Sequence, residues 1–144
     1  MSRTGFTLLE LLIAITLVSI LAAIASATVK SAKDAAYIAV LQSELEKLSL
    51  AQEVYFAERA GYFGESGGEE GTYTKKIGQL DFAPSPNVRI RMRANQNGWS
   101  ARAEHLKRSP DKFFCAIFVG DAKPYRPSTE EGAIKCEPRS TGKK

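Results

Sequence analysis

The sequence is poor in the residues that build metal centres and histidine-based active sites. Its 144 residues include one histidine, His105, and two cysteines, Cys115 and Cys136. These residues leave little material for a zinc site or a histidine-based catalytic triad. We also find no nucleophile elbow, phosphate-binding loop or metal-ligand spacing. We therefore expect a protein without enzymatic activity, cofactor or bound metal.

Charge of one sign is not in large excess either. Lysine and arginine number 20 against 16 aspartates and glutamates, so the formal net charge is +4. This balance excludes a wholly basic nucleic-acid scaffold. The length favours one domain with a modest core over two enzymatic lobes.

The segment from Phe6 to Val29 contains neither proline nor glycine, and its one charged residue is Glu10. As a helix it would be roughly 36 Å long, enough to cross a hydrocarbon core of roughly 30 Å. Arg3 precedes it, and positive charge favours the cytoplasmic side, so the rest of the chain would face outward. An acidic side chain is costly inside such a helix, so Glu10 is expected to need a partner.

An ordinary secretory signal peptide is the alternative for this segment, because Ala25, Ser26 and Ala27 form an A-x-A cleavage pattern. Two features favour a retained span. The apolar stretch is longer than a normal signal core, and Glu10 lies inside it.

The motif GFTLLELLIA, from Gly5 to Ala14, resembles the class III signal of type IV pilins and type II secretion pseudopilins. The resemblance implies that a prepilin peptidase cuts after Gly5 and methylates Phe6, the first residue of the mature protein. It also implies that Glu10 neutralises the amino terminus of a neighbouring subunit. Residues 1–5 would then be a leader peptide, and residues 6–29 a transmembrane helix that later forms the filament core.

The helix is expected to continue beyond the apolar segment, because apolar residues recur at spacings of three and four. These residues are Ile38, Leu41, Leu45, Leu48, Ala51 and Tyr55. Gly61 supplies a stop signal, so we predict one helix from about Thr7 to Ala60. Its amphipathic part, residues 30–60, begins a globular head that comprises residues 30–144.

Residues 61–80 are expected to form a long surface loop, because glycine is frequent there and no periodicity is sustained. Glu65, Glu69 and Glu70 lie in this loop but lack the ligand spacing of a calcium-binding loop. A solvated acidic loop is favoured. In the resembled family, the corresponding connection contacts neighbouring subunits.

Residues 81–144 are expected to supply an antiparallel sheet of three to four strands. In residues 88–93 apolar residues alternate with arginines, which predicts a half-buried strand. The segment from Asn95 to Gly98 predicts a turn, with residues 99–105 as the returning strand. Further strands are predicted at residues 112–119 and 133–137. Packed on the amphipathic helix, they form an α+β roll, in agreement with the pilin head that the resemblance implies.

Cys115 and Cys136 lie in the last two predicted strands. Two buried free thiols are possible, but an exported protein can keep a disulfide. In the chain-entropy model a bridge that closes this loop stabilises the fold by roughly 3 kcal/mol. Many members of the resembled family have a similar carboxyl-terminal bridge, which favours the disulfide.

The resemblance implies a structural subunit, a major or minor pilin, of a type IV pilus filament. The subunit would wait in the inner membrane as a single-pass protein, and an inner-membrane assembly machinery would add it to the filament. There it would contact copies of itself or other pilins on the cell surface. A type II secretion pseudopilin is the nearest alternative.

An alternative of a different class is a minor pilin that binds DNA during uptake. It depends on Arg89, Arg91 and Arg93, which form a basic row on one strand face, and phosphate contacts need such a patch. However, alternating arginines also occur on exposed strand faces, and no aromatic stacking motif accompanies them. We therefore expect no nucleic-acid partner. His105 is expected to be an exposed hairpin residue rather than a catalytic base.

Overall fold

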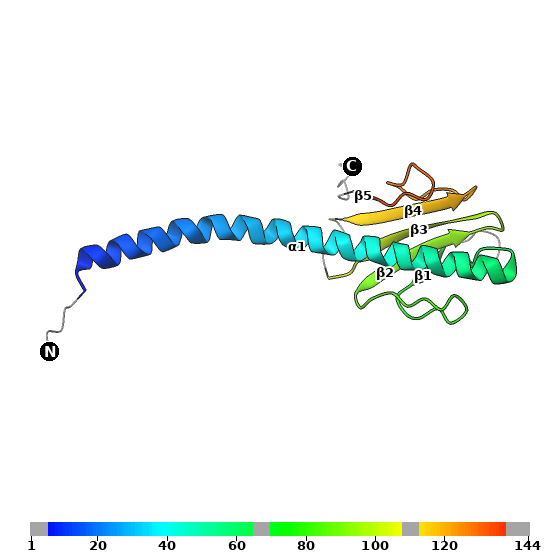
Figure 1. The fold of residues 1–144 in the computed structure, drawn as a ribbon, viewed down its shortest axis with the longest axis horizontal. Helices are drawn as coiled ribbons and strands as arrows, with labels where there is room; N and C mark the ends of the chain where they lie inside the picture. Colours follow the sequence, from blue (N-terminus) through cyan, green and yellow to red (C-terminus); the bar gives the residue numbers. More distant parts are fainter. Residues whose placement is uncertain (1–5, 65–69, 108–112, 138–144) are drawn as a thin grey trace. The chain divides into compact units, whose positions relative to one another are not determined.

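The computed structural model describes residues 6–64, 70–107 and 113–137, without the side chains of residues 25–28, 30 and 31. The chain forms two compact units, Met1–Ala36 and Tyr37–Lys144. One helix and five strands follow one another in the described residues (Figure 1). They are α1 (Leu8–Arg59), β1 (Gly71–Tyr73), β2 (Val88–Ala94), β3 (Gly98–His105), β4 (Phe114–Gly120) and β5 (Lys135–Glu137).

In the first unit, α1 exposes apolar side chains around its whole circumference. The large apolar residues between Phe6 and Ile24 are each 51–85% exposed. Successive positions such as Leu11, Leu12 and Ile13 point about 100° apart, so no side of this segment is polar. A helix that is apolar on every side needs a covering of lipid or protein.

Among the residues that the structure describes, no helix meets the length and apolarity that crossing a membrane requires. The predicted transmembrane stretch, residues 6–29, includes residues 25–28, whose side chains lie outside the described part.

In the second unit, α1 packs on the sheet through the predicted apolar stripe. Leu41, Leu45 and Leu48 are fully buried. Ile38, Ala51 and Tyr55 are partly buried against the same core. The sheet contributes its alternating apolar positions to this core, which are Val88, Ile90, Met92 and Ala94 of β2, Trp99, Ala101 and Ala103 of β3, and Cys115 and Ile117 of β4.

The helix ends one residue earlier than Gly61 predicted. Ala60 adopts the left-handed conformation, with φ of 53°, and its N–H donates to the Phe56 carbonyl at 2.8 Å. Gln52, which is fully buried, then holds the chain as it turns back. Its amide accepts from the Phe63 N–H and donates to the Phe63 carbonyl, both at 2.9 Å. These paired bonds compensate for the strain of a non-glycine residue at positive φ.

The five strands form one antiparallel sheet in the order β1-β2-β3-β4-β5. This confirms the predicted α+β class and a pilin-like fold. The structure adds β1, which the sequence analysis assigned to the loop of residues 61–80. Three residues are too few to show the alternation that marks a strand, so β1 is visible only through its pairing with β2.

Candidate functional site

The first candidate site is the start of α1, where Thr7 and Glu10 form a capping box. The Glu10 N–H donates to Thr7 Oγ1 at 3.2 Å. In return, the Thr7 N–H and hydroxyl both donate to Glu10 Oε2 at 3.3 Å. The Glu10 carboxylate therefore accepts from the free Thr7 N–H at the helix start. Its negative charge also interacts favourably with the positive end of the helix dipole. Gly5 lies outside the described residues, and Phe6 is 82% exposed.

The second candidate is the arginine row of β2, which lies on the sheet face opposite the core. Glu104 of β3 faces this row, with only 4% of its side chain exposed. Arg89 Nη2 donates to it at 2.6 Å and Arg102 Nη2 at 2.7 Å. Arg91 Nε lies 3.7 Å from the same carboxylate. Burial alone would raise the pKa of Glu104, but Arg89 and Arg102 outweigh it and hold the pKa below its ordinary value.

The Arg93 end of the row is covered by Tyr125. The Arg93 guanidinium lies 3.9 Å from the centre of the Tyr125 ring. The Tyr125 hydroxyl donates to Glu70 at 2.6 Å, and Glu70 also pairs with Arg91 and Arg93 at 3.6 Å. Burial and the Glu70 bond raise the pKa of Tyr125 to about 12, so it is a neutral donor at physiological pH.

This arrangement differs from the expected row of solvated arginines without aromatic neighbours. Arg89, Arg91 and Arg93 are 25–34% exposed, and their charges face Glu104 and Glu70. Glu104 was detectable from the sequence, because it follows Arg102 by two positions on a strand and so lies on the same face. Tyr125 was not detectable, because it reaches this face from a loop.

Two further expectations concern Glu70 and His105. Glu70 is not merely a solvated acid, because it bonds to Tyr125, while Glu65 and Glu69 lie outside the described residues. His105 is half-buried rather than exposed, and its ring meets Tyr37 edge-on at 4.6 Å. Burial, aided by the nearby charge of Lys107, lowers the pKa of His105. No group of acidic, cysteine or histidine side chains in the described part could hold a metal ion.

Cys115 and Cys136 lie directly opposite one another in β4 and β5, and the structure joins them by a disulfide. This is the pairing that the sequence analysis predicted. It connects a short edge strand to the fully buried part of β4.

The comparisons with known proteins bear on the amino terminus. Residues 1–26 match a family described as the prokaryotic N-terminal methylation motif. The chain carries a type IV pilin-like class III signal. This signal supports a type IV pilin or pseudopilin family, whose members are structural proteins processed by prepilin peptidase and assembled into pilus-type filaments. Neither a curated protein nor a solved structure matches the chain.

The class III signal covers only one of the two candidate sites. Gly5, Phe6 and Glu10 all lie within the matched residues, whereas the arginine row and the disulfide lie outside them. The signal also suggests a membrane anchor before assembly and an extracellular pilus afterwards.

Proposed function

We propose that this chain is a structural subunit, a major or minor pilin, of a type IV pilus filament. Prepilin peptidase cuts after Gly5 and methylates Phe6, and inner-membrane machinery then adds the mature subunit to the filament. The observation that carries this proposal is the methylation motif over residues 1–26.

The exposed apolar surface of α1 in the first unit supports the proposal. Residues 6–24 need a covering on every side, which lipid provides before assembly and equivalent helices provide afterwards. Because the helix exchanges apolar lipid for the apolar surfaces of neighbouring helices, it can leave the membrane during assembly. The globular head, residues 30–144, remains outside.

The capping box gives Glu10 a second role that an assembly experiment has to separate from charge pairing. Removal of the leader creates a cationic amine at Phe6, and in an apolar fibre core that charge is expensive unless an anion lies near it. Glu10 of an axially shifted neighbour can supply the anion. However, Glu10 also caps its own helix through Thr7.

Three variants distinguish the two roles, because glutamine can replace glutamate in a capping box but carries no charge. The variants are Glu10→Gln, Glu10→Ala and Thr7→Ala, each made in cells that lack the native copy. The measurement is the ratio of cleaved chain in sheared filaments to cleaved chain in membranes. Charge pairing predicts that both Glu10 variants fall to about a tenth of the wild-type ratio or lower, the fold-change that about 1.4 kcal/mol produces. Thr7→Ala retains most of its incorporation.

Wild-type incorporation by Glu10→Gln, combined with a loss in Thr7→Ala, would assign Glu10 to capping alone.

Intact-mass analysis of the same filaments tests the processing step, with methylated Phe6 as the expected first residue. A start at Thr28, after the A-x-A pattern, would remove the pilin proposal. Recovery of the chain as the main component of sheared fibres identifies a major pilin, and trace recovery a minor pilin. Retention in the periplasm with a secretion apparatus identifies a pseudopilin.

A further inference from the structure

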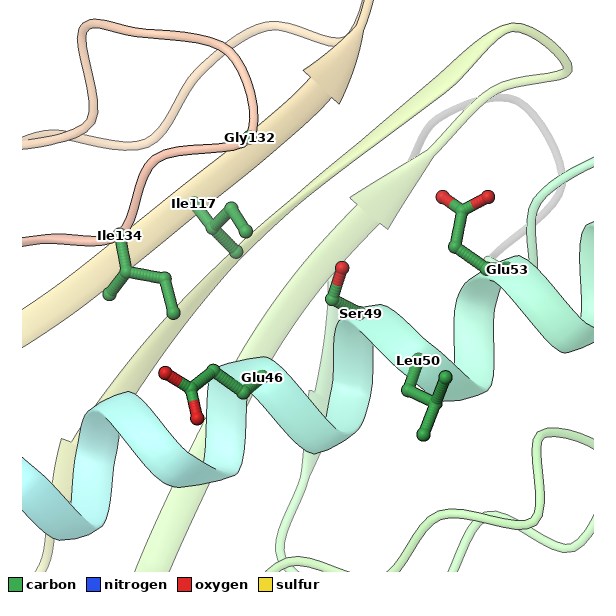
Figure 2. Close-up of a pocket in the computed structure, with 7 residues that line it drawn as sticks. All are labelled: Glu46, Ser49, Leu50, Glu53, Ile117, Gly132 and Ile134. Atoms are coloured by element: carbon green, nitrogen blue, oxygen red, sulfur yellow. The ribbon is translucent and has the colours of Figure 1, made fainter.

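A groove lies on the head between α1 and the carboxyl-terminal part of the sheet (Figure 2). Its volume is about 330 Å³. Apolar contact comes from Leu50 on α1, Ile117 on β4 and Ile134 just before β5. Glu46 and Glu53 line the same groove from α1, and all these residues belong to the second unit.

Within one chain, the described residues leave apolar side chains along the groove exposed and its two glutamates without an ion-pair partner. Leu50 is 69% exposed, and Val54, one turn further along α1, is 53% exposed. Glu46 and Glu53 form no ion pair with a described residue, although the Tyr62 hydroxyl donates to Glu53 at 3.4 Å. The lysines next to groove residues in the sequence are already engaged, since Lys47 pairs with Glu44 and Lys135 with Glu130. The groove therefore offers apolar surface beside two uncompensated negative charges.

A complementary projection lies on the same head, in the turn after β3. Leu106 is 43% exposed, and among the described residues of the head it is the one large apolar side chain exposed outside α1. Lys107 follows it, is exposed, and forms no ion pair with a described residue. A leucine beside a lysine that has no ion-pair partner among the described residues matches the groove in both polarity and charge, because a lysine can lay its stem on apolar surface while its ammonium meets a carboxylate.

We infer that the Leu106–Lys107 turn of one copy docks in the groove of a second copy, with Leu106 against Leu50 and Lys107 between Glu46 and Glu53. This inference rests on the proposed function. The two surfaces differ, so the contact is heterologous and each copy keeps one free groove and one free turn. Such a contact propagates into an open filament unless its rotation closes a ring.

The positions of the two surfaces along α1 give the contact an axial offset. His105, which precedes the turn, packs on Tyr37, whereas the groove is centred near Leu50. Leu50 follows Tyr37 by thirteen positions, which span about 20 Å of helix at 1.5 Å per residue. Neighbouring heads with parallel helices would therefore be displaced by about 20 Å when they dock.

Cysteine cross-linking of the full chain tests the geometry. Leu50→Cys and Leu106→Cys are combined in one chain, in cells that lack the native copy, and sheared filaments are mildly oxidised. Docking predicts a ladder of covalent multimers on a non-reducing gel, with each single variant remaining monomeric. A matched control pairs Leu50→Cys with Lys75→Cys, an exposed position on another part of the head, and gives no ladder.

Charge reversal provides a second measurement that does not depend on added cysteines. Lys107→Glu alone, or Glu46→Lys with Glu53→Lys, should lower the ratio of filament to membrane protein by about fivefold, because like charges then meet across the contact. The triple variant should recover to within about twofold of wild type, because its charges are again complementary.

The docking proposal would be overturned if the double-cysteine chain reached filaments normally but gave no ladder. It would also be overturned if the charge reversals failed to rescue one another. In both cases the filament proposal would stand. A dimer formed by one single cysteine variant would show a symmetric contact and also overturn it. If the wild-type chain never enters a sheared fibre, both proposals fail.

Discussion

At the residue scale, Glu104 is a buried carboxylate that faces three arginines. Arg91 and Arg102 lie directly opposite one another in the β2–β3 register, and like charges in that arrangement repel. Glu104 compensates for this repulsion by binding Arg102 and Arg89 and approaching Arg91. Its removal would leave the partly buried guanidinium groups of Arg89 and Arg102 without an anion among the described residues, whereas Arg91 would keep Glu70.

We expect Glu104→Ala to lower the free energy of unfolding by about 3 kcal/mol, because it breaks a buried ion network on one side only. The arginines keep part of their surface in water, which places the effect at the lower end of the range. Glu130→Ala is the matched control, since Glu130 is 68% exposed in its pair with Lys135 and should matter by about 0.5 kcal/mol or less. Urea unfolding of the three proteins measures both effects, and equal losses would contradict the role of Glu104.

The two buried carboxylates also predict how stability depends on pH. The pKa of Glu44 lies below its ordinary value because hydrogen bonds from Ser85 and the charge of Lys47 outweigh burial, and that of Glu104 is lowered by its arginines. The unfolded chain therefore takes up protons first as the pH falls. Their stabilisation is complete above the ordinary value of 4.5 and is lost below it.

We expect the free energy of unfolding to fall steadily between about pH 5 and pH 3, and to fall less steeply in Glu104→Gln, which cannot titrate there. Denaturant titrations at a series of pH values measure the slope. An unchanged slope in the glutamine variant would show that Glu104 does not contribute.

At the element scale, β5 depends on few interactions. It has three residues, and among the residues that the structure describes it pairs with β4 alone and has no strand on its other side. Its residues are mostly half-buried, so hydrophobic packing contributes little. The Cys115–Cys136 disulfide is therefore the strongest connection between this edge and the core.

Replacement of both cysteines by serine should lower the free energy of unfolding by about 3 kcal/mol, the chain-entropy value for a loop of this size. The loss should concentrate at the edge of the sheet. Hydrogen exchange should accelerate at Lys135–Glu137 far more than at Val88–Ala94, whose strand is paired on both sides. Uniform acceleration would show that the bridge stabilises the whole sheet instead.

The paired glycines at the start of β3 and the end of β4 show how closely neighbouring elements can approach. Gly98 and Gly120 are register partners, and a Cβ on Gly98 would lie 2.5 Å from the Val119 carbonyl oxygen. Gly120 has φ of 67°, in the left-handed region. Both positions require glycine, because a side chain would collide with backbone or impose strain.

At the scale of the whole molecule, the ion pairs of the arginine row bear on the expectation that the chain has no nucleic-acid partner. The guanidinium groups of the arginine row already contact Glu104, Glu70 and Tyr125, so they are less available to phosphates than a row of solvated arginines would be. We therefore expect the full chain in detergent to bind duplex DNA only weakly at physiological salt. Replacement of Arg89, Arg91 and Arg93 by glutamine should leave that weak binding unchanged.

Fluorescence anisotropy across a salt series measures this prediction. If the row contacts phosphates, the triple replacement flattens the salt dependence, by about one unit of slope for each lost contact. Micromolar binding that the replacement abolishes would contradict the expectation.

The sequence by itself determined the features that depend on local pattern. Spacings of three and four predicted the helix and its buried face at Leu41, Leu45 and Leu48, and strict alternation predicted β2. The amino-terminal signal was also predicted, because a peptidase reads a short linear motif. Such patterns survive without tertiary contacts, since each residue's role depends on neighbours within a few positions.

Tertiary structure alone decided the features that join distant segments. Tyr125 meets Glu70 across 55 positions of sequence, and Glu44 accepts from Ser85 across 41. The strand β1 exists only because β2 offers it a free edge, and the groove exists only where α1 faces Ile117 and Ile134. Hydrogen bonds, burial and charge compensation act through space, so their partners cannot be assigned from residue spacing before the sheet has brought them together.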